Sequence, residues 1–288
     1  MARKLKISAG KLNIRLHPHS RERYSAFLRK IYDLRAIGHV HGDRYGMISQ
    51  LDSRQEQQGF ISGIITTFLK IDTEGTWFNT SEMKEATDDQ VSKISIPANL
   101  NPNAATFYFE FDLAKHQLAF QDYSNGKWLT PGSALKFFSS LSRDMAVMAS
   151  FGEAKISIVQ HAEGLERLFS LKKISEIKIT LLKPNPDIFS DDFDEQIEAH
   201  LEVTHSRSIT LTYEADIGSS IQPTPEIRQV SAVALENGKV EVKGRDDTGA
   251  VRKSTEDFPD IVQARYDPEV TSERSAFFAL LRGIIPNG

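Results

Sequence analysis

The sequence predicts an α+β protein built from two mixed halves of sheet and helix. Three observations favour this class: short stretches of alternating apolar residues, helical stretches that begin at a capping residue, and a change of rhythm near Gly152. Before Gly152 the strands follow one another as pairs, and after it strand and helix alternate until a hairpin near the end. Mixed hairpins and crossover helices are typical of α+β folds. We therefore expect two domains, residues 1–151 and residues 152–288, each long enough for its own core.

The first half is predicted to contain five or six strands and two main helices. Ser20 can cap a helix that reaches about residue 35, with its apolar positions on one stripe. A second helix is expected at Thr130, a capping hydroxyl followed by proline, with Met145 and Met148 in its buried stripe as core filler. One or two short strands are predicted around Gly10, within residues 4–16, and the others at residues 45–52, 60–72, 107–111 and 116–120.

The second half is predicted to alternate strands with helices. A hairpin over residues 239–253 is expected to turn near Asp247–Gly249. Gly238 ends the helix before it, as glycine often does after a last helical turn. The other strands are predicted at residues 155–159, 176–182, 208–215 and 261–266, and the helices at residues 162–171, 191–205, 223–237 and 272–285.

The composition is that of a soluble globular protein. The 288 residues are 40% hydrophobic and 26% charged, and there is no cysteine, which excludes a thiol nucleophile and suits a reducing compartment. The basic start lacks the apolar core of a signal peptide. The most apolar run, FISGIITTFLKI at residues 60–71, is too short and too polar to span a bilayer. We expect a cytoplasmic protein without membrane contact.

Charge is distributed unevenly along the chain. Residues 1–35 hold ten lysines and arginines against two acids, a net charge of +8, so the rest of the chain carries −12 of the total of −4. Such a basic segment can bind phosphates, or it can lie against the protein's own acids. Both interpretations stay open. The candidate nucleic-acid contacts are Lys4, Lys6, Lys11, Arg15, Arg21, Arg23, Arg29 and Lys30.

The stretch HVHGD at residues 39–43 has the spacing of some metal sites. A metallo-β-lactamase-like site would continue with a histidine where this chain has Arg44, a cation in a ligand position. Further histidines in a matching context are missing, and the eightfold pattern of an amidohydrolase barrel is absent too. Gly38 and Gly42 can instead supply a turn before the next strand. We expect no metal there.

No other motif predicts an enzyme. Glu241-Val242-Lys243 matches half of a PD-(D/E)xK nuclease site, but the nearest preceding acid, Asp216, is separated from it by a predicted helix. The acids of residues 191–198 are typical of a first helical turn. Phosphate-binding glycine loops and a Gly-x-Ser-x-Gly elbow do not occur. We expect no catalytic residue, no metal and no cofactor.

Four phrases of the sequence carry a resemblance to known proteins: HGDRYGMISQL, GIITTFLKIDTEGTWFN, IPANLNPNAATFYFEFDLAKHQLAFQ and ISEIKITLLKPNPD. Together they resemble a bacterial family of domains of unknown function. Members of that family are near this length, and their genes tend to lie among mobile elements and phage-defence genes. The resemblance would cover almost the whole chain.

The order of predicted elements over residues 155–266 also resembles that of the RexA phage-exclusion protein, a dimeric, sequence-independent DNA binder. The Kiwa defence protein KwaB has a comparable role. This likeness rests on element order and the phrase EIKITLLKPN, and it transfers no individual residue. It implies nucleic acid, DNA in the first place, a second copy of the chain and a defence partner protein as expected partners.

The function expected from the sequence is sequence-independent nucleic-acid binding without catalysis, in phage defence. A metal-dependent nuclease and a protein-interaction module are the alternatives. Binding that falls with salt, without cleavage, would favour the first hypothesis. Degradation that requires Mg²⁺ would favour the nuclease, and the absence of both would favour the interaction module.

Overall fold

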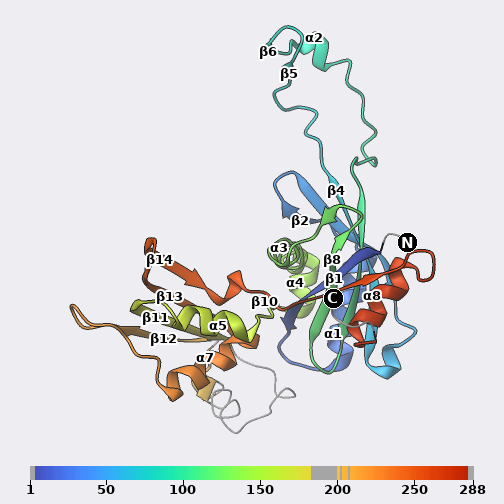
Figure 1. Cartoon of the computed structure of the whole chain (residues 1–288). Coiled ribbons are helices and arrows are strands. Elements are labelled where there is room, and N and C mark those ends of the chain that lie inside the picture. Colours follow the sequence, from blue (N-terminus) through green and yellow to red (C-terminus); the bar gives the residue numbers. More distant parts are fainter. Residues whose placement is uncertain (1–3, 183–199, 202, 207, 285–288) are drawn as a thin grey trace.

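The structure, a computed structural model, describes residues 4–182, 200, 201, 203–206 and 208–284. It confirms the α+β class. Figure 1 shows two lobes side by side. We call the described residues of 4–159 and 260–284 the main lobe, and those of 160–259 the inserted lobe, because the chain leaves the main lobe and returns to it.

The main lobe is built on a large antiparallel sheet. Among the described residues nine strands belong to it, in the order β10-β1-β8-β7-β4-β3-β2, with β15 also on β1 and β9 also on β8. One edge of β1 therefore has two partners in succession, β15 along its first part and β10 along its last. The strands are β1 (Leu5–Arg15), β2 (Gly38–His41), β3 (Arg44–Asp52), β4 (Phe60–Leu69), β7 (Ala105–Asp112), β8 (Gln117–Ser124), β9 (Lys127–Trp128), β10 (Lys155–Ile158) and β15 (Ile261–Tyr266).

Helices cover both faces of this sheet. On one face, α1 (Arg21–Asp33) and α3 (Pro131–Ser142) close a core rich in phenylalanine. On the other, α8 (Glu273–Leu281) packs Phe277 and Leu280 against Ile7 and Ala9 of β1. Side chains alternate along a strand, so neighbouring residues of β1 belong to different cores. The phenylalanine rings of the first core are those of Phe27, Phe107, Phe109, Phe111, Phe120, Phe137, Phe138 and Phe151.

The helix expected from Thr130 onward is shorter than predicted. Thr130 caps α3 as expected, but α3 ends at Ser142 and Asp144 starts α4 (Met145–Phe151) by accepting hydrogen bonds from Ala146 N and Val147 N. The expectation that Met145 and Met148 are buried is wrong: both are exposed, Met145 at 87%. Because Asp144 starts a new helix, α4 runs in another direction from α3. Met145 and Met148 therefore do not continue the buried stripe of α3, whose last residue is Leu141.

The inserted lobe has its own four-stranded sheet, in the order β12-β11-β13-β14. Helices α5 and α7 pack on one face, where Ile177, Ile179, Val240 and Val242 are buried. The other face carries the alternate residues of each strand, which are half-buried or exposed. The elements are α5 (Ala162–Phe169), β11 (Lys173–Leu182), β12 (Ser208–Glu214), α7 (Pro225–Asn237), β13 (Gly238–Asp246), β14 (Gly249–Ser254) and the 3-10 helices η3 (Thr255–Asp257) here and η1 (Glu56–Gln58) in the main lobe.

The two lobes meet at a narrow neck. Asp260 N donates to Val159 O at 2.9 Å, and Gln160 pairs with Pro259, so the chain enters and leaves the inserted lobe at one place. The buried Gln160 amide donates to Ile158 O on the main-lobe side and to Gly238 O on the inserted side, at 3.0 and 2.8 Å. Lys11 and Asp260 form an ion pair of 2.8 Å beside it.

The division at residue 152 stays a prediction, and strand pairing groups the chain in another way. β10 and β15 lie after residue 152 in the sequence, yet both pair with β1. The strands of the inserted lobe pair with one another instead. Pairing therefore places the unit boundaries at residues 159/160 and 259/260.

An arm of residues 70–104 extends away from the main sheet between β4 and β7 (Figure 1). It carries the short strands β5 (Phe78–Asn79) and β6 (Lys84–Glu85) and the helix α2 (Asp88–Val91). None of these residues, all of which the structure describes, is buried. Phe78 and Met83 are exposed at 65% and 81%.

Most predicted elements are confirmed within a few residues, including the helix capped by Ser20 and the hairpin that turns near Asp247. Of the one or two strands expected around Gly10, the structure has one, which runs through that residue. The helix predicted at residues 191–205 lies largely outside the described residues. In the described part of the chain, no helix has the length and apolar character needed to cross a membrane.

Candidate functional site

Two of the four cations of α1, Arg23 and Arg29, have recorded partners within the protein. Arg23 donates to Phe151 O at 3.0 Å, and its guanidinium lies 5.4 Å from the ring of that residue. Arg29 forms an ion pair with Glu56 and donates to Ser25 Oγ at 3.2 Å. These contacts join α1 to α4 and η1, as the self-docking hypothesis expects. Arg21 is exposed and Lys30 is half-buried on the same helix.

Arg15 has no exposed surface and lies inside the main lobe. Its guanidinium donates to Ser157 Oγ at 3.4 Å. Burial lowers the pKa of Arg15 to about 10, although the charge of Tyr24 opposes this, so the side chain is still a cation at neutral pH. A buried guanidinium cannot reach a phosphate at the surface, and we leave Arg15 out of any binding surface.

The remaining predicted contacts, Lys4, Lys6 and Lys11, lie on or beside β1. Lys4 is exposed before the strand, and Lys11 is held at the neck by Asp260. Lys6 points in a different direction, toward aromatic rings: its Nζ lies 5.0 Å from the ring centroid of Trp128 and 5.9 Å from that of Tyr123. Lys6 thus contacts two aromatic rings at once.

These residues form a patch at one end of the main sheet, which we call the basic-aromatic patch: Lys6, Tyr123, Trp128 and Arg265. Lys6 lies opposite Arg265 of β15, and Tyr123 lies opposite Trp128 of β9. Residues opposite one another in antiparallel strands share a face of the sheet. Lys6, Trp128 and Arg265 are exposed, Trp128 at 53%. The patch combines a solvent-facing indole ring with two cations.

A bulge in β8 aligns the patch. Between Ser8 and Ala9 of β1 the register shifts, so that Ser8 pairs with Tyr123 while Ala9 pairs with Gln121. The extra residue, Asp122, is buried and accepts a hydrogen bond from Ser8 Oγ. Burial raises the pKa of Asp122, while the hydrogen bond from Ser8 and the charge of Lys6 oppose that shift. Without the extra residue Tyr123 would fall on the other face.

A tight hairpin brings Trp128 beside Tyr123. Asn125 and Gly126 both have positive φ, of 47° and 79°, which is the conformation that a two-residue hairpin turn requires. The rings of Tyr123 and Trp128 lie 4.8 Å apart. Leu129 follows at once and is fully buried, which fixes the end of this hairpin to the core. The indole is therefore held on a short, anchored strand.

The HVHGD stretch is only partly the turn expected from the sequence: His39 to His41 belong to β2, and Gly42 and Asp43 form the turn to β3. The Nε2 of His39 lies 2.9 Å from Gly42 O, and His41 is exposed. Arg44 donates to Thr67 Oγ1 and Asn103 O at 3.1 and 3.2 Å. In the described part of the chain no group of three metal-ligating side chains occurs. That this stretch binds no metal stays a prediction.

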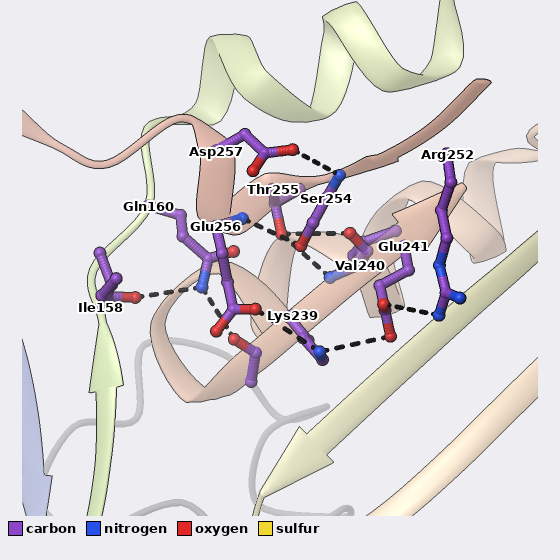
Figure 2. A network of polar contacts seen from close by, with 11 residues as sticks. Ile158, Gln160, Lys239, Val240, Glu241, Arg252, Ser254, Thr255, Glu256 and Asp257 are labelled. Atoms are coloured by element: carbon purple, nitrogen blue, oxygen red, sulfur yellow. Dashed lines mark hydrogen bonds and ion pairs between the residues drawn. The ribbon is translucent and has the colours of Figure 1, made fainter. Parts of the chain in front are cut away.

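The half-motif Glu241-Val242-Lys243 lies within a network of ion pairs. Lys243 pairs with Glu176 at 2.6 Å, and Figure 2 shows Glu241 between Lys239 and Arg252. Burial opposes the ionisation of Glu241, but the two cations outweigh it and lower the pKa of that carboxyl.

Asp216 does not meet the half-motif. It follows β12, and β11 lies between β12 and β13 in the sheet. The structure therefore does not bring the nuclease residues proposed from the sequence together.

Sequence reasoning missed Tyr123, Trp128 and Arg265. The turn signal Ser-Asn-Gly before Lys127 and Trp128 was available, because Asn-Gly between strands predicts a two-residue hairpin and so an edge position for the tryptophan. That Arg265 belongs to the patch could not be predicted from the sequence around it. It depends on the pairing of β15 with β1.

Comparison with known proteins adds one match. No curated protein matches the sequence at a significant level. The model of the family described as Domain of unknown function (DUF4747) matches residues 5–282, which is nearly the whole chain and includes both lobes and the basic-aromatic patch. The resemblance seen in the four sequence phrases is therefore confirmed at the level of the family, and the chain belongs to the DUF4747 family.

Proposed function

We propose that the chain binds nucleic acid without catalysis and without sequence preference, and that it prefers single strands to duplexes. The observation that carries this proposal is the exposed ring of Trp128 with the ammonium group of Lys6 5.0 Å from its centroid. A flat aromatic side chain can stack on an unpaired base of any kind, and neighbouring cations can bind the phosphates beside it. Bases inside a duplex do not offer their faces in this way.

The charges around the ring support the same conclusion. Lys6 and Arg265 lie opposite each other on the outer part of the patch, and Lys4 precedes Lys6 in the chain. One nearby acid, Asp122, is buried and accepts a hydrogen bond from Ser8 Oγ. A second, Glu273, is half-buried and accepts hydrogen bonds from two side-chain amides at 2.7 and 3.5 Å. The patch therefore presents its cations to solvent, and both of these acids have partners within the chain. Phosphate contacts made by such cations carry no base information, so sequence preference is not expected.

The test is a titration of labelled oligothymidine and of a labelled duplex with the full chain, by fluorescence anisotropy at several salt concentrations. Trp128→Ala should weaken single-strand binding by about 1–3 kcal/mol, the cost of one lost stacking contact, or about 5- to 150-fold in Kd. Lys6→Gln should reduce the salt slope by about one unit.

The chain provides its own control, since it contains a second tryptophan, Trp77, on the arm. Trp77→Ala should leave binding unchanged, and the quenching of indole fluorescence by oligothymidine should persist in that variant and vanish in Trp128→Ala. Failure of the wild-type chain to bind any oligonucleotide at low salt would reject the proposal. Cleavage of the oligonucleotide in Mg²⁺ would replace it with the nuclease hypothesis.

A role in phage defence is the wider part of the proposal, and it comes from the family resemblance and not from the site. It predicts that expression of the chain lowers the plating efficiency of a phage, and that Trp128→Ala abolishes the effect. A second copy of the chain and a defence partner protein remain expected partners. Light scattering of the purified chain measures the first, and co-purification from cells measures the second.

A further inference from the structure

The helix α8 and its C-cap residue, Arg282, carry a second stripe that is exposed except for Phe278, which is half-buried against the core. Ala276, Phe277 and Leu280 pack against the sheet, whereas Arg274, Phe278 and Arg282 follow one another at intervals of four residues on another side. The guanidinium groups of Arg274 and Arg282 lie 5.8 and 5.5 Å from the ring centroid of Phe278. These side chains lie beside the part of the sheet face that α8 does not cover.

A groove of about 700 Å³ lies beneath the stripe, which we call the arginine groove. Arg54 and Gln55, which follow β3, and Ser62 of β4 form its opposite wall. A hollow that shares Arg54, Ser62, Arg274 and Phe278 with it continues onto the sheet over Ile64 and Tyr108. The space therefore has guanidinium and hydroxyl groups at one end and an apolar floor at the other.

The charges in the groove are arranged around one acid. Asp52 accepts from Arg54 Nε at 2.9 Å and pairs with Arg274 at 3.4 Å, so its carboxylate holds two guanidinium groups side by side. Hydrogen bonds from Arg54, chiefly from its side chain, keep the pKa of Asp52 far below its usual range, so this anchor is always charged near neutral pH. Arg282 is held by Glu110 at 3.0 Å. Three cations thus meet two acids around the groove.

Of the three arginines around the groove, Arg54 is the one whose position is least explained by a role in holding the fold together. Arg274 and Arg282 can fasten α8 to the sheet through Asp52 and Glu110. Arg54 joins no separate elements, because its partner is two residues away in the sequence, and its side chain is 81% exposed. Its remaining N–H groups are free to face a ligand, and planar guanidinium groups match phosphate oxygens in pairs.

We propose that the arginine groove binds a small ligand that carries phosphate groups and a planar ring, which is the chemistry of a nucleotide. The phosphates would lie between Arg54 and Arg274, and the ring would lie over the apolar floor formed by Ile64, Tyr108 and Phe278. This site is independent of the proposed nucleic-acid interface. It lies on the α8 face of the sheet, whereas Lys6 of β1 points to the other face.

The experiment is calorimetric titration of the full chain with ADP and, separately, with inorganic pyrophosphate, which lacks the ring. ADP should bind more tightly than pyrophosphate. Arg54→Gln and Arg274→Gln should each weaken both probes by about tenfold or more, since each removes charge-assisted hydrogen bonds. The matched control is Arg245→Gln, an exposed arginine on β13 of the inserted lobe, which should change neither affinity.

A further variant separates the two parts of the ligand. Phe278→Leu keeps an apolar side chain but removes the ring, so it should weaken ADP and leave pyrophosphate unchanged. Melting curves of Arg54→Gln should match the wild type, which shows that lost binding is not lost folding.

Three results would overturn the inference. The first is no heat from either probe at millimolar concentration, and the second is equal affinity for the two probes. The third is loss of binding in Lys6→Gln or Trp128→Ala instead of the groove variants. Because the Trp128→Ala variant should bind ADP normally, the failure of one proposal does not imply the failure of the other.

Discussion

The main lobe and the inserted lobe cover their sheets to different degrees. In the main lobe α1 and α3 lie on one face and α8 on the other, and the larger core is lined by phenylalanine rings. In the inserted lobe α5 and α7 lie on the same face, and the core is built mainly from isoleucine, leucine and valine. The opposite face of that sheet carries the charged network of Figure 2.

This difference separates two uses of an antiparallel sheet. Such a sheet can leave one face to water if polar residues alternate with apolar ones, as they do in β11 and β13. The main sheet has helices on both faces, and the two candidate sites lie beside this cover: the basic-aromatic patch at one end of the sheet and the arginine groove beside α8. Candidate binding surfaces in this protein thus occur at the margins of the helical cover.

The largest expected effect comes from removing the inserted lobe. Replacing residues 161–258 by a short Gly-Ser linker should leave the main lobe folded, because Val159 and Asp260 are already joined by a hydrogen bond of 2.9 Å. Calorimetry should show loss of one melting transition and retention of the other.

A fragment of residues 152–288 is the matched comparison for that deletion. It separates β10 and β15 from β1, so α8 should lose its ordered contacts. If this fragment melts with the full heat expected of its length and the linker variant does not melt cooperatively, the grouping by strand pairing is wrong and the division at residue 152 is right.

The second prediction compares single core residues. Phe109→Ala should destabilise the main lobe by about 3–5 kcal/mol, because a fully buried ring leaves a cavity that the rigid sheet cannot close. Ile177→Val in the inserted lobe should cost only about 0.5–1.5 kcal/mol. Each change should lower its own transition in calorimetry. Equal shifts of both transitions by either variant would show that the lobes unfold as one unit.

The third prediction concerns the neck. Gln160→Ala removes a buried amide that bonds to a carbonyl of each lobe, so it should cost about 1–3 kcal/mol and leave Ile158 O and Gly238 O without that donor. Hydrogen exchange should increase at the ends of β10 and β13. Gln263→Ala, an exposed change on β15, is the control and should have little effect. Unchanged exchange at both strand ends in Gln160→Ala would contradict a coupling role.

The smallest effect is expected at Asp122. Burial raises the pKa of Asp122 in the folded chain. The protonated carboxyl therefore contributes its full stabilisation below the ordinary aspartate pKa of 3.8, and this stabilisation is lost as the pH rises through the pKa of the folded state. Asp122→Asn should therefore match the wild type in acid and melt at a higher temperature near neutral pH. The measurement is the difference between the two melting temperatures as a function of pH. A difference that shrinks toward neutral pH would contradict the sign.

Local patterns predicted most elements because the information for them is local. The alternation in Lys173–Leu182 and the cap at Ser20 act within a few residues, and both are found in the structure. The end of α3 at Ser142 was not predicted, because the periodic pattern of apolar residues continues past it. That pattern does not indicate that Asp144 starts a new helix.

The candidate site was predictable only in part. The count of cations in residues 1–35 predicted Lys6 and Arg15 equally as nucleic-acid contacts. In the structure, Lys6 contacts two aromatic rings at the surface, whereas Arg15 is fully buried. Burial of a charge at the end of β1 depends on what covers the strand, which a single-sequence count cannot contain. The pairing of Arg265 with Lys6 has the same origin, because it joins residues from opposite ends of the chain.

The two partners on one edge of β1 have a consequence for biosynthesis. Lys11 of β1 and Asp260, the residue before β15, are 249 positions apart in the sequence, so the first part of this edge, residues 5–10, stays open while almost all the rest is translated. An open edge strand can recruit strands from other nascent chains. The inserted lobe, whose strands pair among themselves, can be complete before the lobe that precedes it. We therefore expect this chain to depart from the usual N-terminal-first order of folding on the ribosome, and chaperones that shield exposed strands to act on residues 5–10.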